Sequence, residues 1–177
     1  PDQSGTPTEG WNRLGTCEWA VDENGQLTIR PLANGKYGVL DIPKDDLKIR
    51  SPIVENANCD VDAINSVKIM PGVHSGKSLE RLFSGLKKVE EMDLAELDTS
   101  NCEDMHYMFF CCSSLKSIDL GAFDTSNVQN MAGMFYGCKS LTSIDLPNIR
   151  NLSVTNTAYM FSGCSSLTSI NLANFDS

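Results

Sequence analysis

The stretch that decides the fold runs from Phe123 to Leu146 and reads FDTSNVQNMAGMFYGCKSLTSIDL, because its pattern recurs every 26 residues. Phenylalanine occupies one position of the repeat four times, as Phe83, Phe109, Phe135 and Phe161. Other apolar positions keep the same phase, as in the columns Met108, Met134 and Met160, then Cys112, Cys138 and Cys164, then Leu94, Leu120 and Leu146. One unit cannot bury its apolar side alone, whereas stacked units form a continuous core. The sequence therefore predicts a repeat protein.

Two periodicities within the unit predict its local structure. The spacing i, i+3, i+4, i+7, typical of one face of a short helix, is shared by Met131, Met134, Phe135 and Cys138. Ile144 and Leu146 instead alternate with polar residues, as in a strand with one buried face. We expect each unit to contain a strand, a polar turn and a short helix. Strands of successive units should pair in parallel, about 4.8 Å apart.

The repeat also resembles a known family. Leu115, Ile118 and Leu120 match the leading part of the leucine-rich-repeat pattern L-x-x-L-x-L. The stretch 123–146 resembles, almost residue by residue, the repeat of the BspA-like leucine-rich-repeat surface proteins, and the resemblance covers about residues 61 to 177. It implies a secreted or wall-associated bacterial protein that serves adhesion to proteins. The expected fold class is α/β and β-rich, a right-handed leucine-rich-repeat solenoid of parallel strands and short helices.

Residues 1–60 lack the repeat phase and are expected to form a β-rich N-terminal cap. Asn24-Gly25 lies between two alternating segments, 18–21 and 26–29, which is a strong β-hairpin signal. Residues 61–177 are expected to form the repeat domain, beginning with an irregular unit in which Val67 and Ile69 lie one residue out of phase. The chain stops at Ser177 part-way through a unit, so we expect a longer array truncated at this point.

The outward-facing strand positions are the candidate binding surface, because repeat proteins bind along the face of their stacked strands. These positions are Glu91, Asp93, Ser117, Asp119, Ser143, Asp145, Ser169 and Asn171. Three of them form an aspartate column in which neighbouring charges would repel by roughly 1 kcal/mol in water and about 3 at a protein–water boundary. Three interpretations stay open: a cationic patch on a partner relieves the repulsion, a divalent ion relieves it, or the carboxylates only keep the sheet soluble.

The seven cysteines divide into repeat and cap residues. Cys112, Cys138 and Cys164 fall on the predicted buried face and should behave as small hydrophobes. Their spacing lacks the short C-x-x-C separation of a zinc site, so no metal site is expected. Cys17 and Cys59 lie in the cap and are candidates for a disulfide bond in an oxidising environment. Cys111 takes the place of a glycine of later repeats and is interpreted as a substitution at a turn.

Composition and motifs argue against several functional classes. The net charge is −9, and no basic cluster is present to bind nucleic-acid phosphates. No apolar run approaches the roughly 18 residues that span a bilayer, so this segment should not insert into a membrane. His106 takes the position of Ala132 and Ala158 and is expected on the surface. No catalytic, phosphate-binding or metal-binding motif occurs, so we expect no enzyme activity and no cofactor.

The sequence therefore favours a secreted or cell-surface module that binds an extracellular protein, such as a host matrix or plasma protein, on a rigid repeat surface. The alternative function is a structural stalk or spacer that holds another domain away from the cell surface. The uniform column Ser117, Ser143 and Ser169 favours the spacer, because a binding face usually varies from repeat to repeat.

Overall fold

Short strands and tight turns make up the part of the chain that the computed structural model describes, residues 5–33, 35–45, 47–56, 59–146 and 153–171. The cap contributes β1 (Asn12–Leu14), β2 (Cys17–Val21), β3 (Gln26–Pro31) and β4 (Gly38–Leu40). The 3₁₀ helix η1 (Val61–Ala63) leads to β5 (Ser66–Ile69), β6 (Val73–Ser75), β7 (Met92–Asp93), β8 (Ser143–Asp145) and β9 (Ser169–Asn171). No helix in these described ranges has the length and apolar character needed to cross a bilayer.

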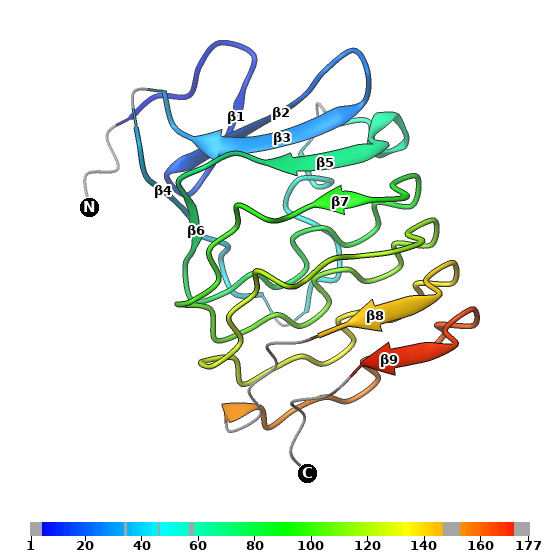
Figure 1. The fold of residues 1–177 in the computed structure, drawn as a ribbon. Helices are drawn as coiled ribbons and strands as arrows, with labels where there is room; N and C mark the ends of the chain where they lie inside the picture. The colour runs from blue at the N-terminus through cyan, green and yellow to red at the C-terminus, as the bar shows by residue number, and fades with distance from the viewer. Residues whose placement is uncertain (1–4, 34, 46, 57–58, 147–152, 172–177) are drawn as a thin grey trace.

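The cap strands and the first repeat strands share one mixed sheet of order β1-β2-β3-β5-β7 (Figure 1). β1, β2 and β3 pair antiparallel, and the hairpin turns at 22–25, where Oδ1 of Asp22 accepts the backbone N–H groups of Asn24 and Gln26. β3, β5 and β7 pair in parallel, with Leu27 opposite Val67 and Val67 opposite Met92. The cap thus continues directly into the repeats through backbone pairing. The division at residue 60 stays a prediction.

Successive repeats stack in the predicted phase. Ser143 pairs with Ser169, and the isolated bridges Ser78–Asp104, Asp104–Asn130 and Asn130–Asn156 keep the same 26-residue offset. The Val67–Met92 pair is offset by 25 residues, which agrees with the irregular first unit. Inside the stack, the phenylalanine rings lie one above another, with centroids 6.0, 5.3 and 5.9 Å apart along Phe83, Phe109, Phe135 and Phe161. One hydrophobic core runs from Cys17 to Met160.

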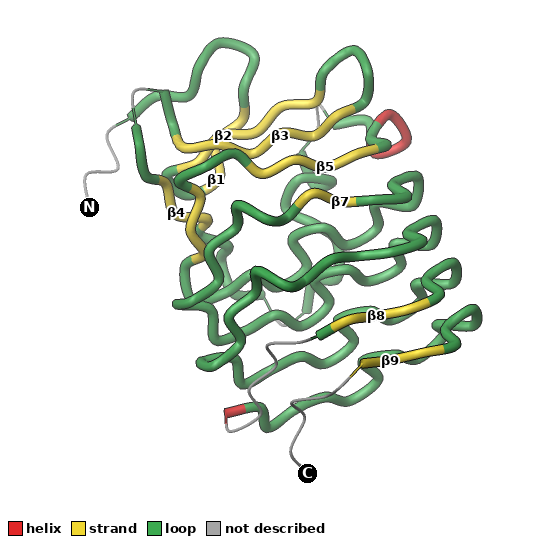
Figure 2. The backbone as a smooth tube through the Cα atoms, viewed as in Figure 1, coloured by secondary structure: helices red, strands yellow, loops and turns green. Residues whose placement is uncertain are grey.

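The predicted short helices are absent, and the fold-class prediction is wrong on this point. The described residues contain no α-helix, and Figure 2 draws the segments 105–112 and 131–138 as loop. Two left-handed residues per repeat prevent a helix, for example Tyr107 at φ 55° and Cys111 at φ 54°. The N–H groups of Tyr107 and Phe109 bond to the next repeat, at Ala132 and Met134, instead of four residues back. Consecutive turns therefore bury the same residues that the helical spacing selected.

The strands also do not join into the continuous parallel sheet of the predicted leucine-rich-repeat solenoid. The described strands form one mixed sheet and two separate two-stranded sheets, β4-β6 and β8-β9. Between β7 and β8, only the isolated bridge Asp119–Asp145 marks the strand position. The extended stretch is short because Oδ1 of Asp119 accepts the N–H of Gly121 at 2.8 Å and starts a turn. The array is β-rich and open.

Changing Cys111 to Gly should stabilise the protein by about 1 kcal/mol, because Cys111 is the one non-glycine in a left-handed column. Gly85, Gly137 and Gly163 hold the equivalent positions at φ 79°, 72° and 75°. Urea denaturation measures the change. The matched control is Gly137→Ala, which should destabilise, because its Cβ would lie 2.9 Å from Sγ of Cys111. A less stable C111G protein would contradict the strain argument.

Candidate functional site

The eight outward residues named above lie together on one exposed face of the stacked strands. The pairs Ser143–Ser169, Asp145–Asn171 and Asp119–Asp145 place five of them in register, and each of the eight side chains is exposed. The row of aspartates continues to Lys68 of β5, which pairs with Asp93. The structure therefore brings the predicted surface together, and a lysine ends its acidic row.

The aspartates of this face also have a structural role. Oδ1 of Asp93 accepts a hydrogen bond from the backbone N–H of Ala95 at 3.3 Å. Oδ1 of Asp145 accepts a hydrogen bond from the side-chain amide Nδ2 of Asn171 at 3.2 Å. With the Asp119 bond to Gly121, each carboxylate of the column has a hydrogen bond that orients it. A ligand on this face would meet carboxylates that are already held in position, so little side-chain entropy would be lost on binding.

The cap cysteines are free thiols in this structure. Cys17 is buried in β2 against Gly38, and burial raises the pKa of its thiol to about 12. Cys59 is half-buried, and partial burial together with the charge of Asp60 raises the pKa of its thiol. Their disulfide stays a prediction.

Cys112 and Cys138 are fully buried inside the stack, as predicted, and Cys164 is half-buried. The thiols of Cys112 and Cys138 each donate to a backbone carbonyl of the preceding repeat, Phe83 and Phe109, at 3.1 Å. Burial raises the pKa of the Cys138 thiol to about 12 and raises that of Cys112 well above its usual value. A protonated, enclosed thiol is a poor nucleophile and a poor metal ligand.

A polar groove of about 620 Å³ crosses the repeats at positions other than the strands. Each repeat contributes two neighbouring residues to it, among them Glu103 and Asp104, Gln129 and Asn130, and Thr155 and Asn156. Ile42 and Lys44 line it as well, and both belong to the segment between β4 and η1. Sequence patterns do not indicate this groove, because its residues recur only as polar positions between the buried apolar ones.

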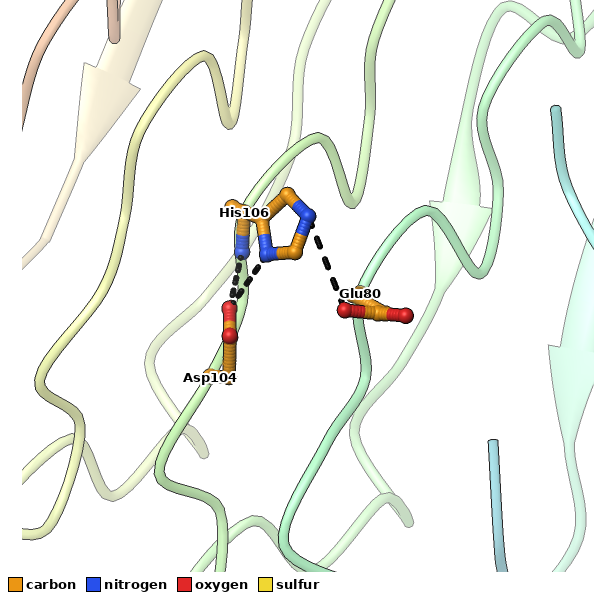
Figure 3. A group of neighbouring side chains, drawn as sticks. All are labelled: Glu80, Asp104 and His106. Atoms are coloured by element: carbon orange, nitrogen blue, oxygen red, sulfur yellow. Dashed lines mark hydrogen bonds and ion pairs between the residues drawn. The ribbon is translucent and has the colours of Figure 1, made fainter. Parts of the chain in front are cut away.

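A buried ionic cluster lies beside the groove. Nδ1 of His106 is 2.6 Å from Oδ1 of Asp104, and Nε2 of His106 is 3.5 Å from Oε2 of Glu80 (Figure 3). Glu80 is fully buried and His106 is 6% exposed, so the expectation of a surface histidine is wrong. Glu80 and His106 are 26 residues apart, and this spacing was the signal that could have placed them side by side.

The charges of this cluster compensate one another. Partial burial works to raise the pKa of Asp104, but hydrogen bonds from His106 and the positive charges of His106 and Lys44 outweigh it and lower the pKa. Oε1 of Glu80 accepts the N–H of Asp45 at 2.7 Å and lies 3.8 Å from Nε of Arg81. Oε2 of Glu80 has no hydrogen-bond partner and faces the imidazole.

This geometry suits a proton better than a metal ion. The two carboxylates face different ring nitrogens of His106, so they do not converge on one coordination position (Figure 3). A cation at Nε2 would have Glu80 and His106 as its protein ligands, whereas a structural zinc site has four. A protonated imidazole would donate to Asp104 and place its positive charge 3.5 Å from the unpartnered Oε2 of Glu80. We therefore interpret the cluster as a structural charge network.

Arg81 and Glu80 also hold the segment that we call the arm, residues 41–45 and 47–56, against the first repeat. Nη1 of Arg81 donates to the carbonyl of Arg50 at 2.7 Å, and the hydroxyl of Ser51 donates to the carbonyl of Leu82. Arg81 is 3% exposed. In Figure 1 the arm follows β4 and is drawn in light blue to cyan.

The repeat region matches a known sequence family. Residues 77–177 match the family model described as a Mycoplasma protein of unknown function, DUF285. The chain belongs to this family. No curated protein matches the chain. Among solved structures it is similar to a leucine-rich repeat protein of T. pallidum, with 22% sequence identity and a TM-score of 0.46, over 94% of this chain and 71% of that chain.

The DUF285 match divides the candidate sites into two groups. It includes the eight outward strand residues and the cluster of Glu80, Asp104 and His106. The arm and the two cap cysteines lie outside it. The resemblance to BspA-like surface proteins is a finer assignment than this family and stays a prediction.

Proposed function

We propose that this chain is a protein-binding module of a secreted or cell-surface bacterial protein, and that it binds without catalysis through its outward strand face. The observation that carries the proposal is a face of eight exposed polar side chains, five of them paired in register, whose aspartates are already hydrogen-bonded in place. A preformed surface loses little entropy on binding, so modest polar contacts can add up to useful affinity. The BspA-like repeat pattern supports an extracellular, adhesive setting.

A structural spacer is the second candidate function. It is favoured by the uniform row Ser117, Ser143 and Ser169, which offers the same small hydroxyl in each repeat. A spacer would need the stacked core but no particular outward side chains. Substitutions at the outward positions should therefore weaken ligand binding if the chain is a binding module, and should have no functional effect if it is a spacer.

We expect the purified chain to bind members of a panel of immobilised plasma and extracellular-matrix proteins. The double variant Asp119→Asn/Asp145→Asn should bind at least about tenfold more weakly, because truncating interface hot spots costs more than 1 kcal/mol. Its binding should also depend less on salt, because two screened charges are gone. Biolayer interferometry at low and physiological ionic strength measures both effects.

The matched control is Glu9→Gln/Glu23→Gln, which removes the same charge from exposed cap positions. It should bind like the wild type. Absence of binding to every panel member would support the spacer, and equal affinity and salt dependence in the Asp119/Asp145 variant would exclude the strand face.

A further inference from the structure

The imidazole of His106 lies where two repeats and the arm meet. Its Nδ1 is 2.6 Å from Oδ1 of Asp104, and the backbone N–H of His106 donates to the same oxygen at 3.0 Å. Because a carboxylate only accepts hydrogen bonds, Nδ1 carries a hydrogen whether the ring is charged or neutral. The proton that the ring gains or loses is therefore the one on Nε2, which faces Oε2 of Glu80 at 3.5 Å (Figure 3).

The carboxylate of Glu80 depends on this proton. Its side chain is fully buried, and its Oε2 has no hydrogen-bond partner in the described part of the chain. With a charged ring, Oε2 faces a positive group, whereas with a neutral ring it faces the lone pair of Nε2. A buried charge that loses its counter-charge is strongly destabilised. Loss of the proton thus makes the enclosed position of Glu80 unfavourable.

The arm is the part of the fold that would respond to this change. The other oxygen of Glu80, Oε1, accepts the backbone N–H of Asp45 at 2.7 Å. Because Glu80 is fully buried with the arm in place, displacement of the arm is the direct route by which water can hydrate its carboxylate. Asp41, Ile42 and Lys44 of the arm also line the polar groove. A displaced arm would therefore widen the groove.

The other charges around this pair do not take the place of the proton. The further titratable or charged groups near His106 and Glu80 come from the arm and the repeats, and they are Lys44, Asp45, Lys48, Glu55, Arg81 and Tyr107. Arg81 lies on the Oε1 side of Glu80, with Nε 3.8 Å from that oxygen and Nη1 3.6 Å from Glu55. The positive charge of Lys44 acts on Asp104, and Lys48 is paired with Asp45 and Glu55. Among the described residues, His106 supplies the cation that pairs with Oε2 of Glu80.

We propose that His106 is a proton-dependent latch for the arm, which holds the arm on Glu80 when the ring is charged and releases it when the ring is neutral. The arm is then held at low pH and released at high pH, because a contact that needs the protonated histidine loses its stability as the pH rises through the titration of that ring. Hydrogen bonds from His106 lower the pKa of Asp104, so this carboxylate stays charged over the same range and does not reverse the effect. The latch acts independently of the outward strand face, so it can be tested whether or not that face binds.

The test follows tryptic cleavage of the arm while the pH is raised from about 6, where an ordinary histidine is mostly charged, to about 9. At the acidic end, cleavage after Lys48 and Arg50 should be at least about tenfold slower in the wild type than in His106→Gln, because the neutral amide supplies no charge and the arm opens more often. Comparing the two proteins at each pH, with EDTA present, cancels the pH dependence of trypsin itself. The ratio of the two rates should approach one as the NMR signal of the His106 imidazole reaches its neutral position.

Two controls connect the effect to this pair. His74→Gln removes the other histidine of the chain, which pairs with Asp98, and should leave the pH dependence of the ratio unchanged. Glu80→Gln keeps a carbonyl acceptor for the N–H of Asp45 but carries no charge. Its arm should therefore be cleaved at the same rate with and without the further change His106→Gln, at every pH.

The wild-type chain also tests the latch without any substitution. Because the N–H of Asp45 donates to Glu80, its amide signal should shift with the same pH midpoint as the imidazole signal of His106. This measurement replaces the cleavage comparison for any variant that does not fold.

Several results would overturn the proposal. One is equal cleavage of the wild type and His106→Gln at about pH 6, since the arm would then be held without the proton. Another is a cleavage ratio, or an Asp45 amide signal, that stays constant while the His106 signal titrates. A His106 signal that does not move up to about pH 9 would also contradict the latch, because the arm would then never be released.

Discussion

Replacing Phe135 by Ala is expected to lower the free energy of unfolding by about 3–5 kcal/mol. Phe135 is fully buried and lies between Phe109 and Phe161, with centroids 5.3 and 5.9 Å away and rings within 8° of parallel. The cavity would separate two repeats that are stabilised mainly by their contacts with each other. Urea denaturation followed by far-ultraviolet circular dichroism measures the loss.

The neighbouring aromatic residue Tyr136 provides the control for Phe135. Tyr136 is 37% exposed, so Tyr136→Ala should cost clearly less, about 1 kcal/mol. A loss below about 1 kcal/mol for Phe135→Ala would be incompatible with a phenylalanine stack at the centre of the core.

Replacing Arg81 by Met is expected to cost about 3–5 kcal/mol, as does the removal of one partner from a buried ion pair. Arg81 is the buried cation next to Glu80, and its guanidinium also lies 3.6 Å from Glu55. Without it, Glu80 loses a compensating charge and the carbonyl of Arg50 loses its donor. The arm should then detach more often, so trypsin should cleave faster after Lys48 and Arg50.

A second substitution tests this explanation. The double variant Glu80→Met/Arg81→Met should be more stable than Arg81→Met alone, because it removes the uncompensated charge as well. Arg50→Met, at an exposed position of the arm, should change stability by less than about 1 kcal/mol. If the double variant is less stable than the single variant, the buried charge is not the cause of the loss.

Burial was predictable from the sequence even where secondary structure was not. Met105, Met108, Phe109 and Cys112 are all fully buried, although the helix expected for them is absent. Burial follows from the repeat, because stacking places equal positions above one another and apolar columns can only face the core. The helical prediction failed because consecutive turns can produce the same i, i+3, i+4, i+7 spacing. The left-handed residues Tyr107 and Cys111 distinguish the two cases, and only the backbone shows them.

The candidate sites also divide into one that the sequence predicted and one that required the structure. The outward rows of Asp119, Asp145 and their neighbours could be listed from the 26-residue phase alone. The same phase could have placed Glu80 beside His106, but the burial of this cluster could not be predicted, because it depends on Arg81 holding the arm beside it.

By itself, the sequence determined the repeat length, the buried columns and the polar rows, because each of these depends only on residues recurring in phase. Tertiary structure alone decided that the units are turns without helices, that the strands form separate mixed and parallel sheets, and that the arm covers the first repeat. The physical reason is that these features depend on hydrogen bonds between segments far apart in the chain, such as Phe109 to Met134 and Arg81 to Arg50, which no local pattern encodes.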